Sequence, residues 1–226
     1  MSLSSQFAPG ELRSILIAWF VLSFAISISY IEGLFSGRDG IIDIAAAFIA
    51  TATAFILHEM SHKFVAISRG YVAHFQIWIW GIALTLITAI AFQGAFIFGA
   101  PGAVYIAPAA AAGYYGYYNS TRTGRIGNPQ RDELVISLAG PGTNLVFAIF
   151  FLFLLFVTPI GGFVWTVASY GVGLNVGLGS FNMLPIPPID GYKIFKSNIA
   201  IGLIVALPLW ALFLFFFLNL YRKNPK

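Results

Sequence analysis

The sequence contains no cysteine and little charge, since only 9% of its 226 residues are Asp, Glu, Lys or Arg. Without cysteine there is no disulfide and no thiolate, so any metal ion must be held by nitrogen and oxygen ligands. The formal net charge of +4 comes from Lys and Arg that form no basic run, and this spacing predicts no nucleic-acid partner. Hydrophobic residues make up 59% of the chain, against about 45–50% in soluble domains. The composition predicts an integral membrane protein embedded in a lipid bilayer.

Apolar segments near the length of a membrane-spanning helix recur along the chain. A helix needs about 20 apolar residues to cross the hydrocarbon core. Five segments meet that requirement, namely residues 12–30, 41–66, 134–157, 162–184 and 198–220. We therefore expect an all-α polytopic bundle of five to six transmembrane helices, forming one domain over residues 1–226 with its core at about 41–197 and peripheral helices at about 12–30 and 198–220.

The stretch from Trp78 to Val104 is apolar but ambiguous, because it contains Gln93 and several glycines and follows AHFQIWIW, whose alternation favours a strand. A single crossing here would place the ends of segments 41–66 and 162–184 on opposite sides of the membrane. We expect instead a β-hairpin or re-entrant element at about 72–105, although two short crossings would also preserve the topology. With five spans, the positive-inside rule places the end marked by Lys63 and Arg69 in the cytoplasm.

The polar group HEMSH at residues 58–62 interrupts an otherwise apolar segment. Ionisable residues at membrane depth are costly and usually functional. His58 and His62 are four residues apart, so one helix face presents both imidazoles to a single ion. In this spacing the histidines are metal ligands and the intervening carboxylate, Glu59, is the general base.

A hydrolytic zinc site needs a third protein ligand. Asp190 follows PIPP, where three prolines must unwind the helix, and irregular backbone at membrane depth indicates a functional cavity. His74 and Asp43 are the competing candidates. Asp190 also balances the charge, because one divalent ion, two neutral imidazoles and the carboxylates of Asp190 and Glu59 sum to zero. Asn182, at the same helix break, is placed to bind a peptide carbonyl or an oxyanion.

Three motifs together resemble the site-2 protease family of intramembrane metalloproteases: HEMSH at 58–62, AGPGTN at 139–144 and NMLPIPPIDG at 182–191. The resemblance covers about residues 45–195. It implies one zinc ion on His58, His62 and Asp190, catalytic Glu59, and Asn182 near the scissile carbonyl. It also implies a closely packed helix at AGPGTN and a short form without PDZ-like or CBS-like domains.

These observations predict a zinc metalloendopeptidase that cleaves in or near the transmembrane segment of a protein or peptide substrate, as in regulated intramembrane proteolysis. We expect a multi-pass protein of a prokaryotic cell membrane, with its active site near the cytoplasmic side. One alternative is a divalent metal transporter or channel that uses the same His and Asp groups for transit. Another is a binder or regulator without catalysis, which an intact Glu59 argues against.

Overall fold

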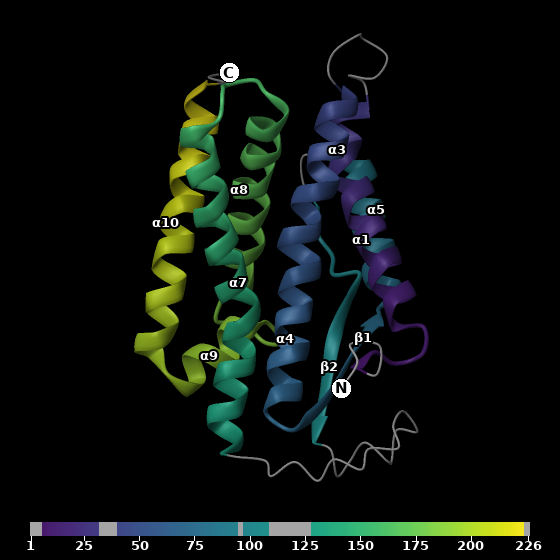
Figure 1. Cartoon of the computed structure of the whole chain (residues 1–226), viewed down its shortest axis with the longest axis vertical. Helices are drawn as coiled ribbons and strands as arrows, with labels where there is room; N and C mark the ends of the chain where they lie inside the picture. The colour runs from purple at the N-terminus through teal and green to yellow at the C-terminus, as the bar shows by residue number, and fades with distance from the viewer. Residues whose placement is uncertain (1–5, 32–39, 95–96, 109–127, 224–226) are drawn as a thin grey trace.

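The computed structural model describes residues 6–31, 40–94, 97–108 and 128–223. They form a bundle of long helices with a small antiparallel β-ribbon on one side (Figure 1). The helices are α1 (Glu11–Ser27), α3 (Gly40–Thr51), α4 (Leu57–Ser68), α5 (Ile79–Ala91), α7 (Pro129–Val157), α8 (Phe163–Asn182), α9 (Asp190–Ser197) and α10 (Ile199–Lys223), and the strands are β1 (Tyr71–Ile77) and β2 (Gly102–Pro108). The expected all-α membrane bundle with a hairpin is confirmed.

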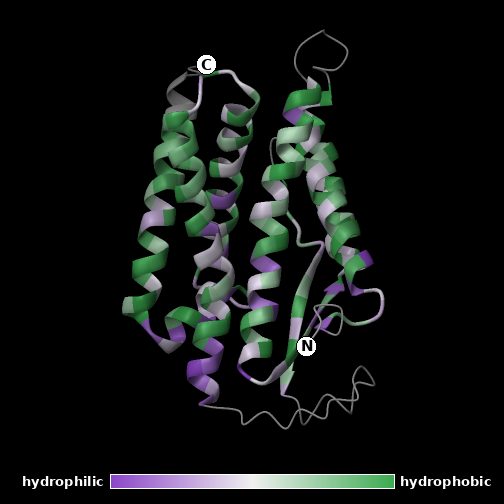
Figure 2. Cartoon of the chain, in the orientation of Figure 1, coloured by the Kyte–Doolittle hydropathy of each residue, from purple (hydrophilic) through white to green (hydrophobic). Residues whose placement is uncertain are grey.

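Four helical stretches in the described part of the chain are long and apolar enough to cross a membrane: Glu11–Tyr30, Gly40–Ser68, Pro129–Val157 and Ile199–Phe216. Apolar residues cover most of their length, and hydrophilic residues gather near one end of the bundle, at the start of α7 and around α9 (Figure 2). The fifth expected span corresponds to α8, which is 20 residues long. Its glycines and asparagines make it less apolar, and it packs between α3, α7 and α10.

The ambiguous segment forms a β-hairpin, and the connection between its two strands contains a short helix. Helix α5 has 13 residues and is therefore about 20 Å long, too short for a hydrocarbon core of about 30 Å. After it the chain returns, and β2 pairs antiparallel with β1 from Ile77 opposite Gly102 to Tyr71 opposite Pro108. The predicted strand AHFQIWIW extends too far, because β1 ends at Ile77 and α5 begins at Ile79. Between them, Trp78 donates its backbone N–H to the Pro101 carbonyl at 3.0 Å.

Helices α4 and α8 run in the same direction and end at the same end of the bundle (Figure 1). Helix α7 lies between α4 and α8 in the sequence and runs in the opposite direction to both (Figure 1). It is the single crossing that brings the ends of α4 and α8 to the same side. The chain then leaves the helical path between Asn182 and Asp190, as the prolines predict, and α9 lies at this end of the bundle. Helices α1 and α10 begin at this end and run to the opposite one, so α10 ends on the other side from the start of α1.

Close packing of small residues holds α7 and α8 together. Gly171 on α8 lies against the ring of Phe151 on α7, where an added Cβ would overlap the ring carbons. Phe151 belongs to a buried cluster with Ala148, Ala168 and Val172. In a lipid environment helices associate through such van der Waals contact, because burial of apolar surface gives little gain there.

Lys63, one of the two basic residues by which the sequence marks this end of α4, is paired inside the protein. Its side chain is fully buried and forms an ion pair with Glu11, which is 3% exposed. Lys63 also donates to the Ala73 carbonyl at 3.2 Å, and Glu11 accepts from the Phe75 N–H at 2.8 Å. Each charge therefore has a partner that compensates its burial, and the pair ties the start of α1 to α4 and β1.

Candidate metalloprotease site

The structure brings His58, His62 and Asp190 together. The two Nε2 atoms are 3.1 Å apart, and the Oδ2 atom of Asp190 lies 3.0 Å from Nε2 of His62 and 3.7 Å from Nε2 of His58. Both histidines are buried and Asp190 is largely so. These residues form one group of potential metal ligands in the described chain, as the sequence predicts.

The spacing of the three ligand atoms fits one zinc ion. Zinc binds imidazole nitrogen and carboxylate oxygen at about 2.0–2.2 Å, so tetrahedral ligands are about 3.3 Å from each other. The separations of 3.0, 3.1 and 3.7 Å lie close to that value. Two imidazoles and one carboxylate also match the donor set of catalytic zinc sites, which keep a fourth position for water or substrate.

Two oxygen atoms of helix α7 lie within hydrogen-bond distance of the two imidazoles. Nδ1 of His58 lies 2.6 Å from Oδ1 of Asn144, and Nδ1 of His62 lies 2.7 Å from the carbonyl oxygen of Ile136. Both partners are acceptors, so each Nδ1 carries the proton and each Nε2 is left free to bind a metal. Asn144, the last residue of the AGPGTN motif, is therefore a support for His58.

A short π-helical segment just before α4, the helix that carries His58 and His62, anchors Asn144. Residues Ala52–Ile56 form this π-turn between α3 and α4, and π-turns often occur at functional sites because they displace carbonyls from the regular ladder. The amide of Asn144 donates to the Ala54 carbonyl at 2.9 Å and to Asn175 Oδ1 at 3.1 Å, and Asn175 donates to Thr53 at 3.1 Å. The sequence analysis missed Asn175, Thr53 and the π-turn.

Gly140 allows α7 to approach the metal ligands. A Cβ at this position would lie 2.5 Å from Cε1 and 2.6 Å from Nε2 of His58, and closer still to Nε2 of His62. The close packing expected of AGPGTN is thus confirmed for Gly140. It is wrong for Gly142, where an added Cβ would have no atom within 4 Å.

Asp190 is presented by the first turn of α9, where the helix dipole favours a carboxylate. Gly191 lets α9 pack against the end of α8, because a Cβ there would overlap the backbone of Met183. Burial would raise the pKa of Asp190, but the adjacent imidazoles of His62 and His58 hold that pKa well below its usual range. Lys193 lies 3.9 Å from Oδ1, the oxygen that does not face the histidines.

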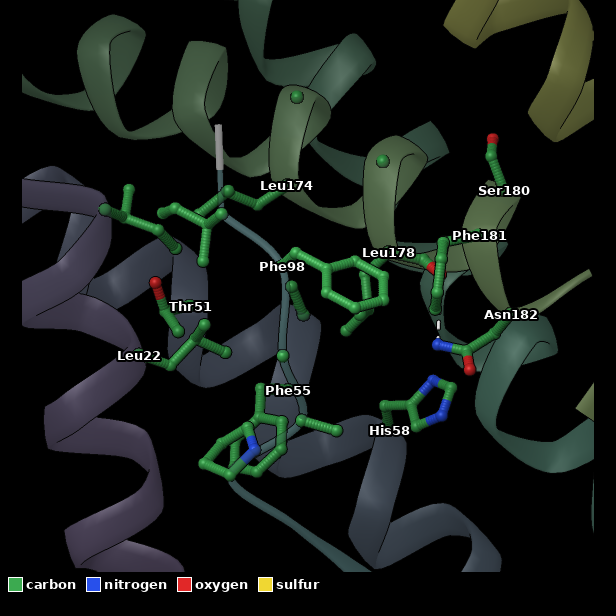
Figure 3. Close-up of a pocket in the computed structure, with 18 of the residues that line it drawn as sticks. Leu22, Thr51, Phe55, His58, Phe98, Leu174, Leu178, Ser180, Phe181 and Asn182 are labelled. Carbon is green, nitrogen blue, oxygen red and sulfur yellow. Dashed lines mark hydrogen bonds between the residues drawn. The ribbon is translucent and has the colours of Figure 1, made fainter. Parts of the chain in front are cut away.

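Glu59 lies beside the ligands and accepts a hydrogen bond at 3.0 Å from the backbone N–H of Val104 on β2. His58, Glu59 and Asn182 line a cavity of about 540 Å³ that is otherwise mostly apolar. Figure 3 shows Asn182 extending from the end of α8 toward His58 at one end of this cavity. Its amide also donates to the Leu178 carbonyl at 3.0 Å, so Asn182 stabilises the helix end as well.

The competing ligand candidates lie elsewhere. His74 is on β1, where its ring stacks on Tyr105 at 6.3 Å and contacts the Gln76 amide at 2.6 Å. Asp43 is in the first turn of α3, at the far end of the long helix from His58. Neither belongs to the group formed by Asp190 and the two histidines.

Comparison with known proteins agrees with this geometry. The chain is 35% identical over 190 residues to "Putative zinc metalloprotease MJ0611" of Methanocaldococcus jannaschii, an alignment that covers 84% of this chain and 90% of that protein. It is 34% identical over 83 residues to "Putative zinc metalloprotease YwhC" of Bacillus subtilis, covering 33% of this chain and 38% of that protein. No protein-family model and no solved structure matches the chain. The chain therefore belongs to the same family of zinc metalloproteases as the Methanocaldococcus protein.

Proposed function

We propose that this metalloprotease is an intramembrane endopeptidase, which hydrolyses a peptide bond in or near the transmembrane segment of its substrate. The observation that carries the proposal is the position of the site. The ligand group and Glu59 open into an apolar cavity, and helices of membrane-spanning length form much of its wall. Residues from α1, α8 and α10, such as Leu22, Leu174 and Phe213, line it. An apolar substrate segment is the chemistry that such a lining accepts.

His58, His62 and Asp190 would hold one zinc ion. When bound, zinc acts as a Lewis acid that polarises the scissile carbonyl and lowers the pKa of water. Glu59 is placed to take a proton from the attacking water and to return it to the leaving amine. Asn182, at the same end of the cavity, is placed to donate a hydrogen bond to the carbonyl oxygen as negative charge develops there.

The β-ribbon offers an edge for an unwound substrate. A substrate helix must unwind before hydrolysis, and an added strand would replace its lost backbone hydrogen bonds. The outer side of strand β1 lies against α1, with the Phe75 N–H bound to Glu11. We therefore assign the docking edge to β2, which lies beside α4 and Glu59.

The motif resemblance extends the proposal to membership of the site-2 protease family and to a role in regulated intramembrane proteolysis. The site lies near the end of the bundle where α4, α8 and α7 meet α9. The positive-inside rule supports a cytoplasmic position for this end, because Arg69 follows α4, Arg131 lies in the first turn of α7, and Lys193 and Lys196 lie on α9. We also propose a prokaryotic cell membrane as its location.

The proposal is tested by cleavage of a single-span substrate in proteoliposomes, with the cut site mapped by mass spectrometry. We expect zinc-dependent cleavage within or next to the transmembrane segment, and weaker cleavage when proline replaces residues along β2. Cleavage confined to soluble peptides would refute the intramembrane assignment. Flux of divalent metal without cleavage would favour the transporter alternative instead.

A further inference from the structure

Carboxylates cap both outer edges of the β-ribbon. Phe75 on β1 donates its N–H to Oε1 of Glu11 at 2.8 Å, and Val104 on β2 donates its N–H to Oε2 of Glu59 at 3.0 Å. Phe75 and Val104 are opposite each other in the register. Directly opposite residues in an antiparallel ladder either bond to each other or direct both N–H groups outward, and the bonds to Glu11 and Glu59 show that this pair is of the outward kind. One donor on each edge is therefore bound by a carboxylate.

The two carboxylates differ in their surroundings. Glu11 is 3% exposed and is bound from three sides, by Lys63 and by the N–H groups of Phe75 and Ala8, the last at 2.8 Å. Glu11 therefore has a structural role, because these contacts hold α1 against α4 and β1. Glu59 instead faces the cavity beside His58, and it is the group that must accept a proton during hydrolysis. The edge of β2 is thus capped by the proposed catalytic base itself.

A strand that pairs with β2 must use the same donor. Every second residue of β2 directs its backbone N–H and C=O groups to the outer edge of the ribbon. These residues are Gly102, Val104 and Ile106. An added strand would place a carbonyl on the Val104 N–H, where the carboxylate of Glu59 now lies. The two acceptors compete for one donor.

Resting on the proposed function, we propose that Val104 restrains Glu59 in the free enzyme and that the arriving substrate strand releases it. The substrate carbonyl takes the Val104 N–H, and Glu59 becomes free to accept the proton of the attacking water. Since one hydrogen bond replaces another, the exchange requires little net free energy. Val104 is thus a positioning residue. A ligand that does not pair with β2 brings no carbonyl for the Val104 N–H, so it must break the Val104–Glu59 hydrogen bond without replacing it.

Acetohydroxamate is the probe that separates these events, because it binds catalytic zinc, gives its proton to the neighbouring carboxylate and is too small to form a strand. Val104→Pro removes the N–H that holds Glu59. Ile106→Pro removes an N–H of the same edge that does not contact Glu59, and it is the matched control. A hydrogen bond to a charged group corresponds to about tenfold or more in an equilibrium constant. We expect Val104→Pro to bind acetohydroxamate about tenfold more tightly than wild type, and Ile106→Pro to bind it as wild type does.

Both proline variants should raise the KM for a strand-forming substrate, so the hydroxamate result distinguishes restraint of Glu59 from loss of docking. Zinc content verifies that each variant is folded. If Val104→Pro loses zinc, the α-hydroxy acid analogue of valine at position 104 removes the same N–H with little change of shape and gives the same expectation. Equal affinities in zinc-loaded wild type and variants would overturn the release mechanism alone. Failure of wild type to bind zinc would overturn the metalloprotease mechanism as well.

Discussion

Replacing Gly140 by alanine should disable the metal site through one added methyl group. A methyl carbon and a ring atom need about 3.5–4.0 Å between them, whereas the new Cβ would lie 2.5–2.6 Å from atoms of His58 and closer to His62. The rings cannot retreat freely, because Asn144 and the Ile136 carbonyl hold their Nδ1 atoms. A displacement of about 1 Å follows, which exceeds the tolerance of about 0.2 Å for zinc ligand distances. Loss of ligand support alone costs about 10–100-fold in metal affinity, so we expect at least about 100-fold for Gly140→Ala.

Competition with a chromogenic chelator measures this affinity in detergent. Gly142→Ala is the matched control, because it adds the same methyl group two residues away in open space. It should keep wild-type zinc affinity and cleavage. Wild-type affinity in Gly140→Ala, or an equal loss in both variants, would show that the approach of α7 to the histidines is not what shapes the site.

Three further predictions concern the support of His58, the buried Lys63–Glu11 pair and the stability that a bound metal provides. Asn144→Leu should weaken zinc binding about 10–100-fold by freeing the His58 ring, and an unchanged chelator titration would contradict this. Lys63→Met should destabilise the fold by about 3–5 kcal/mol, because Glu11 is left as an uncompensated buried charge. Adding Glu11→Gln to Lys63→Met should recover much of that loss in thermal unfolding, and a double variant no more stable than the single one would refute the explanation. Chelation should lower the unfolding temperature of wild type through loss of bound metal but leave Asp190→Ala unaffected, and equal shifts would indicate binding elsewhere.

Local spacing was enough to predict which three residues form the group of potential metal ligands. His58 and His62 share a face because a helix repeats every 3.6 residues, and Asp190 follows prolines that must end a helix. The hairpin followed from topology, since one more membrane crossing at residues 72–105 would have separated Asp190 from the two histidines. These inferences require only the residues close to each motif in the sequence and the number of times the chain crosses the membrane.

The supports of the site depend on contacts between distant residues and could not be predicted in this way. Asn144 meets His58 across 86 positions, and Asn175 meets Thr53 across 122. The π-turn that exposes the Ala54 carbonyl has no composition signal in ATAFI. Lys63 resembled a surface residue because lysine at a helix end usually is one, and only its partner Glu11, 52 positions earlier, explains its burial.

The most direct test of the account compares wild type with Glu59→Gln, which keeps the size of the side chain and removes its ability to accept a proton. Zinc content and cleavage of a single-span substrate are measured on the same purified samples. The account predicts one zinc per chain in both proteins, with cleavage in wild type that Glu59→Gln lacks. Cleavage by Glu59→Gln at the wild-type rate would contradict the assignment of Glu59 as the base.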